Sequence, residues 1–364
     1  MGVSKKNLDI EALRGFAIIV TVYAHLRLLF PWSPDWFEKS LKYLSPSVGV
    51  DLFFCISGYV ITSSILSDKK NHAGFKGFAI PFWIRRVWRL WPSAWLWVSI
   101  NLLCAYFINW GGSFGVPFNT VMSSVAALGH FANIYFPYCV SHDSCGSNMV
   151  NWSLSLEEQF YFIFPFLFFY IGRLRLALLL MLLIISQIFL YRPAASLLWS
   201  IRTDAICAGV ILALYKDKIC VIFDIAFRRF SGVPYLLFIV ACTSIATIPV
   251  TKYGSTFGVA TIVCFIFLAI AAGKNEIIPC GKLKDVFVYL GSRSYAIYLC
   301  HEVVFRLINE VYNRLNAQKY FGFENVLAFS LIGLFLTLML SELNFRYVEI
   351  PLRNYGRDLA NKYI

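Results

Sequence analysis

Long apolar segments constrain the fold of this chain more than any other feature. Ten of them could cross a hydrocarbon core of about 30 Å as helices that rise about 1.5 Å per residue. They lie at residues 9–30, 48–67, 88–108, 159–172, 174–190, 196–215, 233–249, 256–272, 286–311 and 324–345. Because a backbone in lipid must satisfy its own hydrogen bonds, the pattern predicts an all-α integral membrane protein with about ten transmembrane helices. Residues 119–136 could add an interfacial or re-entrant helix.

Composition and charge support this class. Only 14% of the 364 residues are charged and 59% are hydrophobic, whereas about 25% of residues in soluble domains are charged. The net charge of +12 does not indicate nucleic-acid binding, because no soluble domain with a basic face is present. If both termini are cytoplasmic, most lysines and arginines fall in inner loops, as the positive-inside rule requires. The expected outer loops carry few, among them Arg192 and Arg314.

The first apolar run carries two residues that are costly in lipid. In RGFAIIVTVYAH, Arg14 and His25 are eleven residues apart, so they share a helix face about 16 Å apart along the axis. Thr21 lies on the same stripe. A packed helix with a snorkelling arginine explains Arg14 but not a histidine more than halfway across the membrane. Arg14 and His25 are therefore candidate catalytic residues. Four other arginines lie in apolar runs and are functional candidates by default: Arg27, Arg202, Arg293 and Arg306.

Three arginines cluster at the expected inner end of the third span. Arg85, Arg86 and Arg89 fall within about one turn of FWIRRVWRLWP, residues 82–92, with tryptophans between them. Guanidinium groups on one turn, interleaved with indole rings, suit a phosphate-rich ligand with a stackable base. The alternative is a basic and aromatic belt that holds lipid headgroups.

Two further stretches place acids at helix starts. Asp51 begins a span in VGVDLFFCISGY, where Ser57-Gly58 would permit close helix approach. It either faces an arginine or is a solvated acid. Glu157 lies with Glu158 in NWSLSLEEQFYFIFP, residues 151–165. A buried carboxylate could orient a catalytic imidazole, whereas solvated acids at a helix N-terminus are the alternative.

Two more stretches place ionisable residues within the bundle. We expect Arg202 and Asp204, in IRTDAICAG, to be ion-paired inside the bundle, either with each other or with groups on other helices. His301, in SRSYAIYLCHE, either lines the same cavity or is a buried structural histidine. With Asp51, these three residues are the candidate substrate-binding group.

Cysteine usage gives one open question. Cys139 and Cys145 lie in YCVSHDSCGS on the expected outer side, where an oxidising compartment would allow a short disulfide. A disulfide and two free thiols are both compatible with the sequence. No His/Cys cluster has the spacing of a metal site, so we expect no metal.

Taken in order, the motifs resemble the acyltransferase-3 superfamily of polytopic membrane acyltransferases. The matching pieces are LDIEALRGFAIIVTVYAH, GVDLFFCISGYVIT, RRVWRLWP, NWSLSLEEQFY, RTDAICAG, SRSYAIYLCH and FRYVEIPLR. The resemblance implies a ten-helix domain that moves an acyl group, usually acetyl, from cytoplasmic acyl-CoA to a glycan hydroxyl on or near the outer side. Some members append an extracytoplasmic SGNH esterase-like domain. This sequence shows no such segment, so we expect residues 1–364 to be the single-domain form.

The resemblance also implies residue roles. The family's first-helix arginine and histidine fall on Arg14 and His25, its RxxR arginines on Arg86 and Arg89, and its helix-start glutamate on Glu157. In this interpretation Arg85, Arg86 and Arg89, together with Arg14, hold acetyl-CoA. His25 acts as general base with Glu157 orienting its ring, or it forms a covalent acyl-histidine.

The same resemblance implies which molecule accepts the acyl group and in which membrane the enzyme lies. We expect a bacterial cytoplasmic (inner) membrane enzyme that acetylates lipopolysaccharide O-antigen or an exopolysaccharide. Peptidoglycan, a lipid-linked intermediate or a small metabolite are the alternative acceptors. A glycolipid transporter and a non-catalytic scaffold are the rivals outside enzymes. The expected partners are acetyl-CoA, a glycan or glycolipid acceptor and membrane lipids, but no nucleic acid. A homo-oligomer is left open.

Overall fold

The structure, a computed structural model, is built from helices. It describes residues 7–29, 35–43, 48–67, 74–188, 190–193, 195–228, 256–273, 281–315 and 323–363, and this part of the chain contains no strand. The main helices are α1 (Leu8–His25), α3 (Val48–Ser67), α4 (Gly74–Phe107), α7 (Asn151–Tyr170), α8 (Arg173–Ile188), α10 (Asp204–Leu214), α13 (Thr256–Ala272), α15 (Ser294–Arg314) and α16 (Phe323–Asn344). Shorter helices are α2 (Asp35–Tyr43), α5 (Pro117–Leu128), α6 (Ala132–Ser141), α9 (Leu197–Ser200), α11 (Lys216–Arg228), α14 (Lys282–Ser292) and α17 (Ile350–Ala360). The all-α prediction is confirmed.

Five helical segments are long and apolar enough to cross a membrane within the described ranges. They are Leu8–Leu29, Val48–Ser67, Gly74–Phe107, Leu197–Leu214 and Val326–Tyr363. The span predicted over 256–272 coincides with α13, which is a shorter apolar helix. The span predicted over 233–249 lies outside the described residues. Ten spans and cytoplasmic termini stay predictions.

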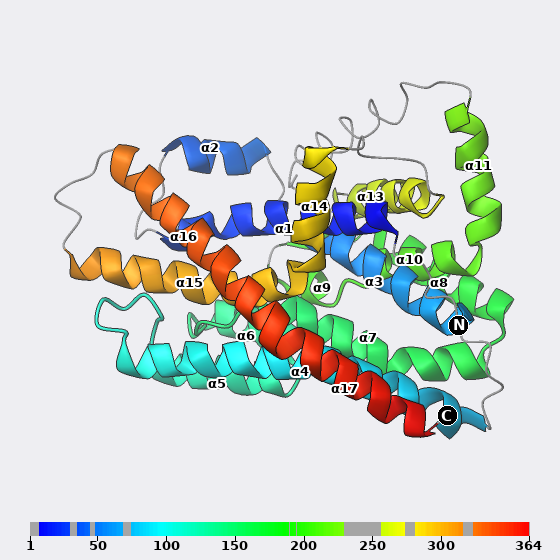
Figure 1. Ribbon diagram of the computed structural model, residues 1–364, viewed down its shortest axis with the longest axis horizontal. Helices are drawn as coiled ribbons and strands as arrows, with labels where there is room; N and C mark the ends of the chain where they lie inside the picture. Colours follow the sequence, from blue (N-terminus) through cyan, green and yellow to red (C-terminus); the bar gives the residue numbers. More distant parts are fainter. Residues whose placement is uncertain are drawn as a thin grey trace.

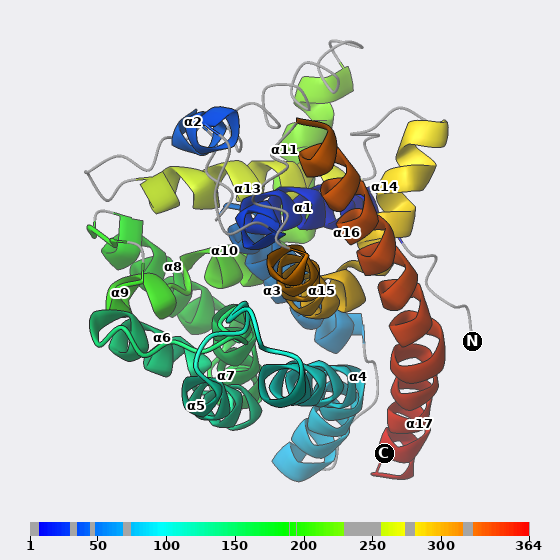
Figure 2. The ribbon, with the colours of Figure 1, turned by 90° about the vertical axis from the view of Figure 1, so that its left-hand side faces the viewer.

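Helices from both ends of the chain meet at the centre of the bundle. Viewed along the bundle, α1, α3 and α15 lie inside a ring that includes α4, α7, α8, α13 and α16 (Figure 2). The start of α1 and the end of α17 point to the same end of the molecule (Figure 1). Groups on the inward faces of α1, α4, α7 and α15 can therefore share one interior space.

Glycines bring the central helices into backbone contact. A Cβ atom on Gly58 of α3 would lie 2.2 Å from the Ile206 carbonyl oxygen, and one on Gly209 of α10 only 1.9 Å from that of Cys55. Small residues at a helix crossing allow this approach, so the close packing expected from Ser57-Gly58 is confirmed. Gly291 of α14 crosses α1 in the same way, since its Cβ would lie 1.8 Å from the Glu11 carbonyl oxygen.

Two predicted spans are broken by polar residues that bind elsewhere. The segment 286–311 divides at Arg293 into α14 and α15, which run in different directions (Figure 1). Arg293 there donates to Glu342 of α16 at 2.8 Å. The segment 196–215 divides after Ser200, and Arg202 in the break reaches Asp51. Hydropathy averages across a break of a few residues, so the sequence suggested single helices.

The third span also begins earlier than predicted. Helix α4 starts at Gly74 and not at 88, and it continues through Pro81 and Pro92. The arginines that lower its local hydropathy are good helix formers, so they interrupt the apolar pattern without ending the helix. The cluster Arg85, Arg86 and Arg89 therefore lies within a 34-residue helix and not at its end.

Candidate active site

A central cavity collects four of the residues singled out from the sequence. It has a volume of about 60 Å³ and lies between α1, α3, α4, α7 and α15. Its charged lining residues are Arg14, Arg86, Arg89 and Glu157, among mainly apolar neighbours. A largely apolar cavity with a few convergent polar groups is typical of a small-molecule site. The side chain of Arg14 also lies 3.7 Å from Glu11, and its Nε has no hydrogen-bond partner within the described residues.

A second, strongly basic pocket adjoins this cavity. Arginines from two helices line it: Arg85, Arg86 and Arg89 of α4, and Arg353 and Arg357 of α17. Because Arg86 and Arg89 line both spaces, the two spaces adjoin at these side chains. Neither has a carboxylate within ion-pair distance in the part of the chain that the structure describes. Guanidinium groups placed in this way suit phosphates.

Two of these arginines were missed by the sequence reasoning. Arg353 closes the motif FRYVEIPLR and Arg357 follows one turn later, a spacing that places both on one helix face. The packing of α17 on α4 brings them to the basic pocket. Gly356 of α17 lies against Trp88, where an added Cβ would come within 2.3 Å of the Trp88 Cβ. The i, i+4 arginine pair was the available signal, but the sequence could not show which helix it would meet.

The tryptophans of the same motif pack against neighbouring helices. Trp83 donates to the Tyr161 carbonyl at 3.2 Å, and Trp91 donates to Glu158 at 2.8 Å. The ring of Trp88 lies 4.6 Å from that of Tyr355. The expectation that these rings offer a stacking surface for a base stays a prediction, and the N–H groups of Trp83 and Trp91 already bind α7.

Glu157 lies in the central cavity with hydroxyl partners. Ser57 and Tyr161 both donate to its Oε1 atom. The expected contact with His25 is wrong for this structure, because the neighbour of the His25 ring is another imidazole. Glu157 is also the seventh residue of α7, so it faces inward from the second turn and does not cap the helix start.

His25 contacts His301, which is 276 residues away in sequence. The His301 Nε2 atom lies 3.1 Å from the His25 Nδ1 atom, and the His301 Nδ1 atom lies 3.2 Å from the Ile297 carbonyl oxygen. His301 is fully buried while His25 is partly exposed. Neither ring lines the central cavity, but Tyr298 does, and its ring centroid lies 5.7 Å from that of His301. The histidine pair is therefore one residue layer from the cavity.

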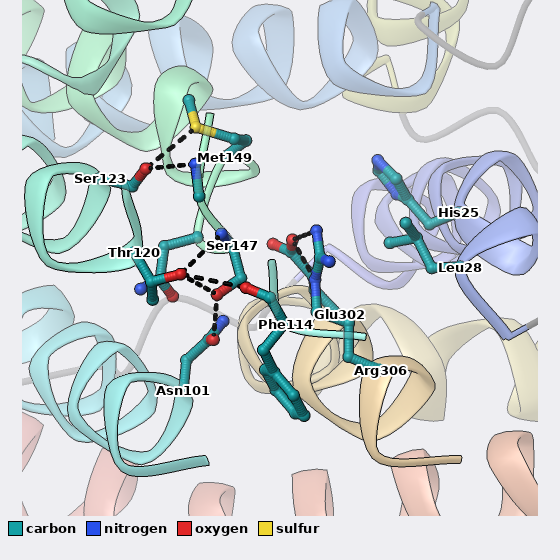
Figure 3. A network of polar contacts seen from close by, with 12 residues as sticks. His25, Leu28, Asn101, Phe114, Thr120, Ser123, Ser147, Met149, Glu302 and Arg306 are labelled. Atoms are coloured by element: carbon teal, nitrogen blue, oxygen red, sulfur yellow. Dashed lines mark hydrogen bonds and ion pairs between the residues drawn. The ribbon is translucent and has the colours of Figure 1, made fainter. Parts of the chain in front are cut away.

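The surroundings of His25 include a charged pair on α15. Figure 3 shows His25 on α1 across from Glu302 and Arg306. Arg306 donates to Glu302 at 2.8 Å and to the Ser113 carbonyl at 2.8 Å. Arg306 thereby joins α15 to the segment that follows α4. It is one of the arginines found in the apolar runs, and these bonds satisfy its charge inside the protein.

Polar contacts also hold the region between α4 and α7. The Ser147 hydroxyl donates to Asn101 at 2.6 Å and lies 3.3 Å from the Thr120 hydroxyl (Figure 3). Cys139 and Cys145 form a disulfide in this region, which resolves the alternative left open by the sequence. The bonds fix the segment from which α7 begins, and α7 carries Glu157.

The remaining substrate-binding candidates are in buried ion pairs. Arg202 donates to Asp51 at 2.8 Å, and Arg192 donates to Asp204 at 2.9 Å. All four side chains are at most 1% exposed, and none lines the central cavity. The prediction that Arg202 and Asp204 are ion-paired is confirmed. Arg192, expected in an outer loop, is instead part of this core, and the geometry favours a structural role for the group.

The ordered motifs, several of which contribute residues to the central cavity, agree with a comparison to known families. A family model described as an acyltransferase domain, of the acyltransferase-3 type, matches residues 7–342. The chain belongs to the acyltransferase-3 family. The match covers the helices that line the central cavity, from α1 to α15, and it ends before α17. Two of the five arginines of the basic pocket, Arg353 and Arg357, therefore lie beyond the matched part of this acyltransferase-3 chain.

Curated relatives of this acyltransferase-3 chain are O-acetyltransferases by name. The peptidoglycan O-acetyltransferase OatA of Listeria monocytogenes is 26% identical over 96% of this chain and 56% of its own length. The O-acetyltransferase OatA of Staphylococcus aureus is 25% identical over 95% and 57%. The putative peptidoglycan O-acetyltransferase YrhL of Bacillus subtilis is 26% identical over 95% and 55%. The chain thus spans about half the length of the curated relatives it matches. No solved structure matches the chain.

Proposed function

We propose that this protein is an integral membrane O-acetyltransferase that uses acetyl-CoA as acyl donor. One observation carries the proposal: Arg86 and Arg89 line both the five-arginine pocket and the cavity that holds Arg14 and Glu157. The phosphates of the donor would bind in the basic pocket, and the thin pantetheine arm would enter the cavity. Family membership and the names of the relatives support acyl transfer over transport.

His25 is the proposed catalytic residue. As a general base, its imidazole takes the proton of the acceptor hydroxyl while that oxygen attacks the thioester carbonyl. The tetrahedral intermediate then collapses, the C–S bond breaks, and the imidazolium returns the proton to the CoA sulfur. In the covalent alternative the ring nitrogen attacks the thioester carbonyl first, and the C–S bond breaks to release CoA thiolate. The acyl-histidine then passes the acetyl group to the hydroxyl, whose proton goes to the thiolate, and the free imidazole is restored. Both routes need an unprotonated ring nitrogen that faces the reacting groups.

Glu157 and Arg14 act in the cavity and not on His25 in this proposal. The Glu157 carboxylate, held by Ser57 and Tyr161, would accept hydrogen bonds from the amide groups of the pantetheine arm. Arg14, whose Nε has no hydrogen-bond partner among the described residues, would help to hold the donor on the side of the cavity that Arg86 and Arg89 line. This assignment replaces the orienting role that the sequence suggested for Glu157.

The proposed acceptor is a glycan hydroxyl, with peptidoglycan placed first. Two of the named relatives are peptidoglycan O-acetyltransferases by name, which favours peptidoglycan over the lipopolysaccharide O-antigen expected earlier. A cytoplasmic membrane location with the acceptor on the outer side belongs to the same proposal.

Two experiments test the function. Protein purified into liposomes should transfer label from radioactive acetyl-CoA to soluble glycan fragments, and free CoA thiol should be released in equal amount. Transport of a glycolipid without release of CoA would support the transporter instead. Cells with and without the gene should differ in the O-acetyl signals of one glycan by NMR. Comparing purified peptidoglycan with surface polysaccharide identifies which glycan it is.

A further inference from the structure

Two polar contacts connect the Ile297 carbonyl of α15 to the His301 ring and the His301 ring to the His25 ring. The Ile297 carbonyl lies 3.2 Å from the His301 Nδ1 atom, and the His301 Nε2 atom lies 3.1 Å from the His25 Nδ1 atom. His301 and Ile297 are one helical turn apart, so the first contact is fixed by α15 itself. The centroids of the two rings lie 4.9 Å apart, and the ring planes are tilted by 45°.

The first link determines the proton on His301. A carbonyl oxygen can only accept a hydrogen bond, so the His301 Nδ1 atom carries the hydrogen. The ring is fully buried, and no carboxylate lies within ion-pair distance of it in the described part of the chain, because the adjacent Glu302 binds Arg306. A charged imidazolium there would be costly. His301 is therefore neutral, and its Nε2 atom is an acceptor.

The second link then determines the proton on His25. An acceptor at 3.1 Å requires a donor, so the His25 Nδ1 atom must carry its hydrogen toward His301. We propose that His301 is a positioning residue that holds His25 in the tautomer whose Nε2 lone pair is free for the reaction. This inference rests on the proposed function, because it assigns the use of that lone pair to acyl transfer. Either route of the proposed reaction uses the same nitrogen.

A matched pair of substitutions separates this role from packing. His301→Gln keeps an amide that can donate to Ile297 and accept from His25, whereas His301→Met has a similar length and no comparable acceptor. We expect His301→Gln to keep substantial activity. We expect His301→Met to lower kcat about 100-fold, the scale of general-base catalysis, with an unchanged KM for acetyl-CoA. Equal kcat values for the two variants, at equal abundance in the membrane, would overturn the inference.

A spectroscopic measurement tests the tautomer without activity. In ¹⁵N-histidine-labelled protein in nanodiscs, the His25 signals are those lost in His25→Ala, since the chain has only five histidines. We expect a protonated Nδ1 and an unprotonated Nε2 in the native protein, and loss of this preference in His301→Met. The reverse tautomer in the native protein would contradict the inference. So would an unchanged tautomer in the methionine variant, because the Thr21 carbonyl near the His25 ring would then suffice.

Two variants distinguish a failure of the proposed function from a failure of the positioning role of His301. If His25→Ala retains full activity, the proposed catalytic role of His25 is wrong, whatever the tautomer is. If His25→Ala is inactive but His301→Met is as active as His301→Gln, only the positioning role of His301 is wrong.

Discussion

Arg202 and Asp51 form an ion pair at 2.8 Å, although they are 151 residues apart in sequence. Arg202 lies in the break between α9 and α10, and Asp51 lies in the first turn of α3. The rings of Trp199 and Phe257 cover the guanidinium at 4.7 and 4.5 Å from its Cζ atom. The helical hydrogen bonds are interrupted between α9 and α10, and the ion pair connects this break to α3, the helix that packs most closely on α10.

Removing one partner of this pair should destabilise the protein. Arg202→Met or Asp51→Leu leaves an uncompensated buried charge, which costs about 3–5 kcal/mol. The double variant should recover much of that loss, because both charges are then absent. Thermal unfolding in detergent, read as a double-mutant cycle, measures the coupling. The exposed pair Arg357–Asp358, 63% and 69% exposed, is the control, and Arg357→Met should cost at most about 1 kcal/mol. Additive single losses would contradict a coupled pair.

The arginines of α17 should contribute to donor binding. Arg353→Ala and Arg357→Ala should each raise the KM for acetyl-CoA about tenfold, which corresponds to about 1.4 kcal/mol, because each removes a phosphate-binding guanidinium. The KM for the glycan acceptor should stay constant. Steady-state kinetics with each substrate varied in turn measures both. Arg346→Ala, at an exposed arginine of the same helical segment that binds Glu342, is the matched control. A similar change in that control would point to a general charge effect.

Loss of the His25 imidazole should abolish acetylation without loss of protein. His25→Ala removes the group that accepts or transfers a proton, so label transfer from acetyl-CoA should fall by about 100-fold or more. Membrane abundance, measured by immunoblot, should match the native protein. His142→Ala is the control, since His142 is exposed in the segment after α6 and contacts Ser141 and Tyr138. Full acetylation by His25→Ala at normal abundance would exclude the proposed chemistry.

The crossing of α3 and α10 should not tolerate a methyl group. Gly209→Ala would place a Cβ 1.9 Å from the Cys55 carbonyl oxygen, so the helices must separate and the melting temperature should fall. Alanine is otherwise favoured over glycine in a helix by about 1 kcal/mol, so a loss must come from packing. Gly77→Ala in α4 meets nothing within 4 Å and should be neutral or stabilising. Equal melting temperatures for the two variants would contradict the proposed crossing.

Helix positions were predicted well where an apolar run is uninterrupted. The predicted span 48–67 coincides with α3, and the predicted span 256–272 coincides with α13. Errors arose where a polar residue binds another helix. Arg293 ends α14 because it reaches Glu342, and hydropathy contains no information about such a partner. The close approach at Gly58 was predictable, because a small residue on an apolar helix favours contact whatever the neighbour is.

The sequence by itself determined that the chain forms apolar helices, and that Arg14 and His25 lie on one face of the first. Both follow from local rules, since a backbone in lipid must bond to itself and helical periodicity orders the side chains. Only the tertiary structure decided which polar groups meet. It paired His25 with His301 and not with Glu157, and it brought Arg353 to the arginines of α4. The physical reason is that a buried polar group takes the partner that helix packing places beside it, and that partner can lie hundreds of residues away.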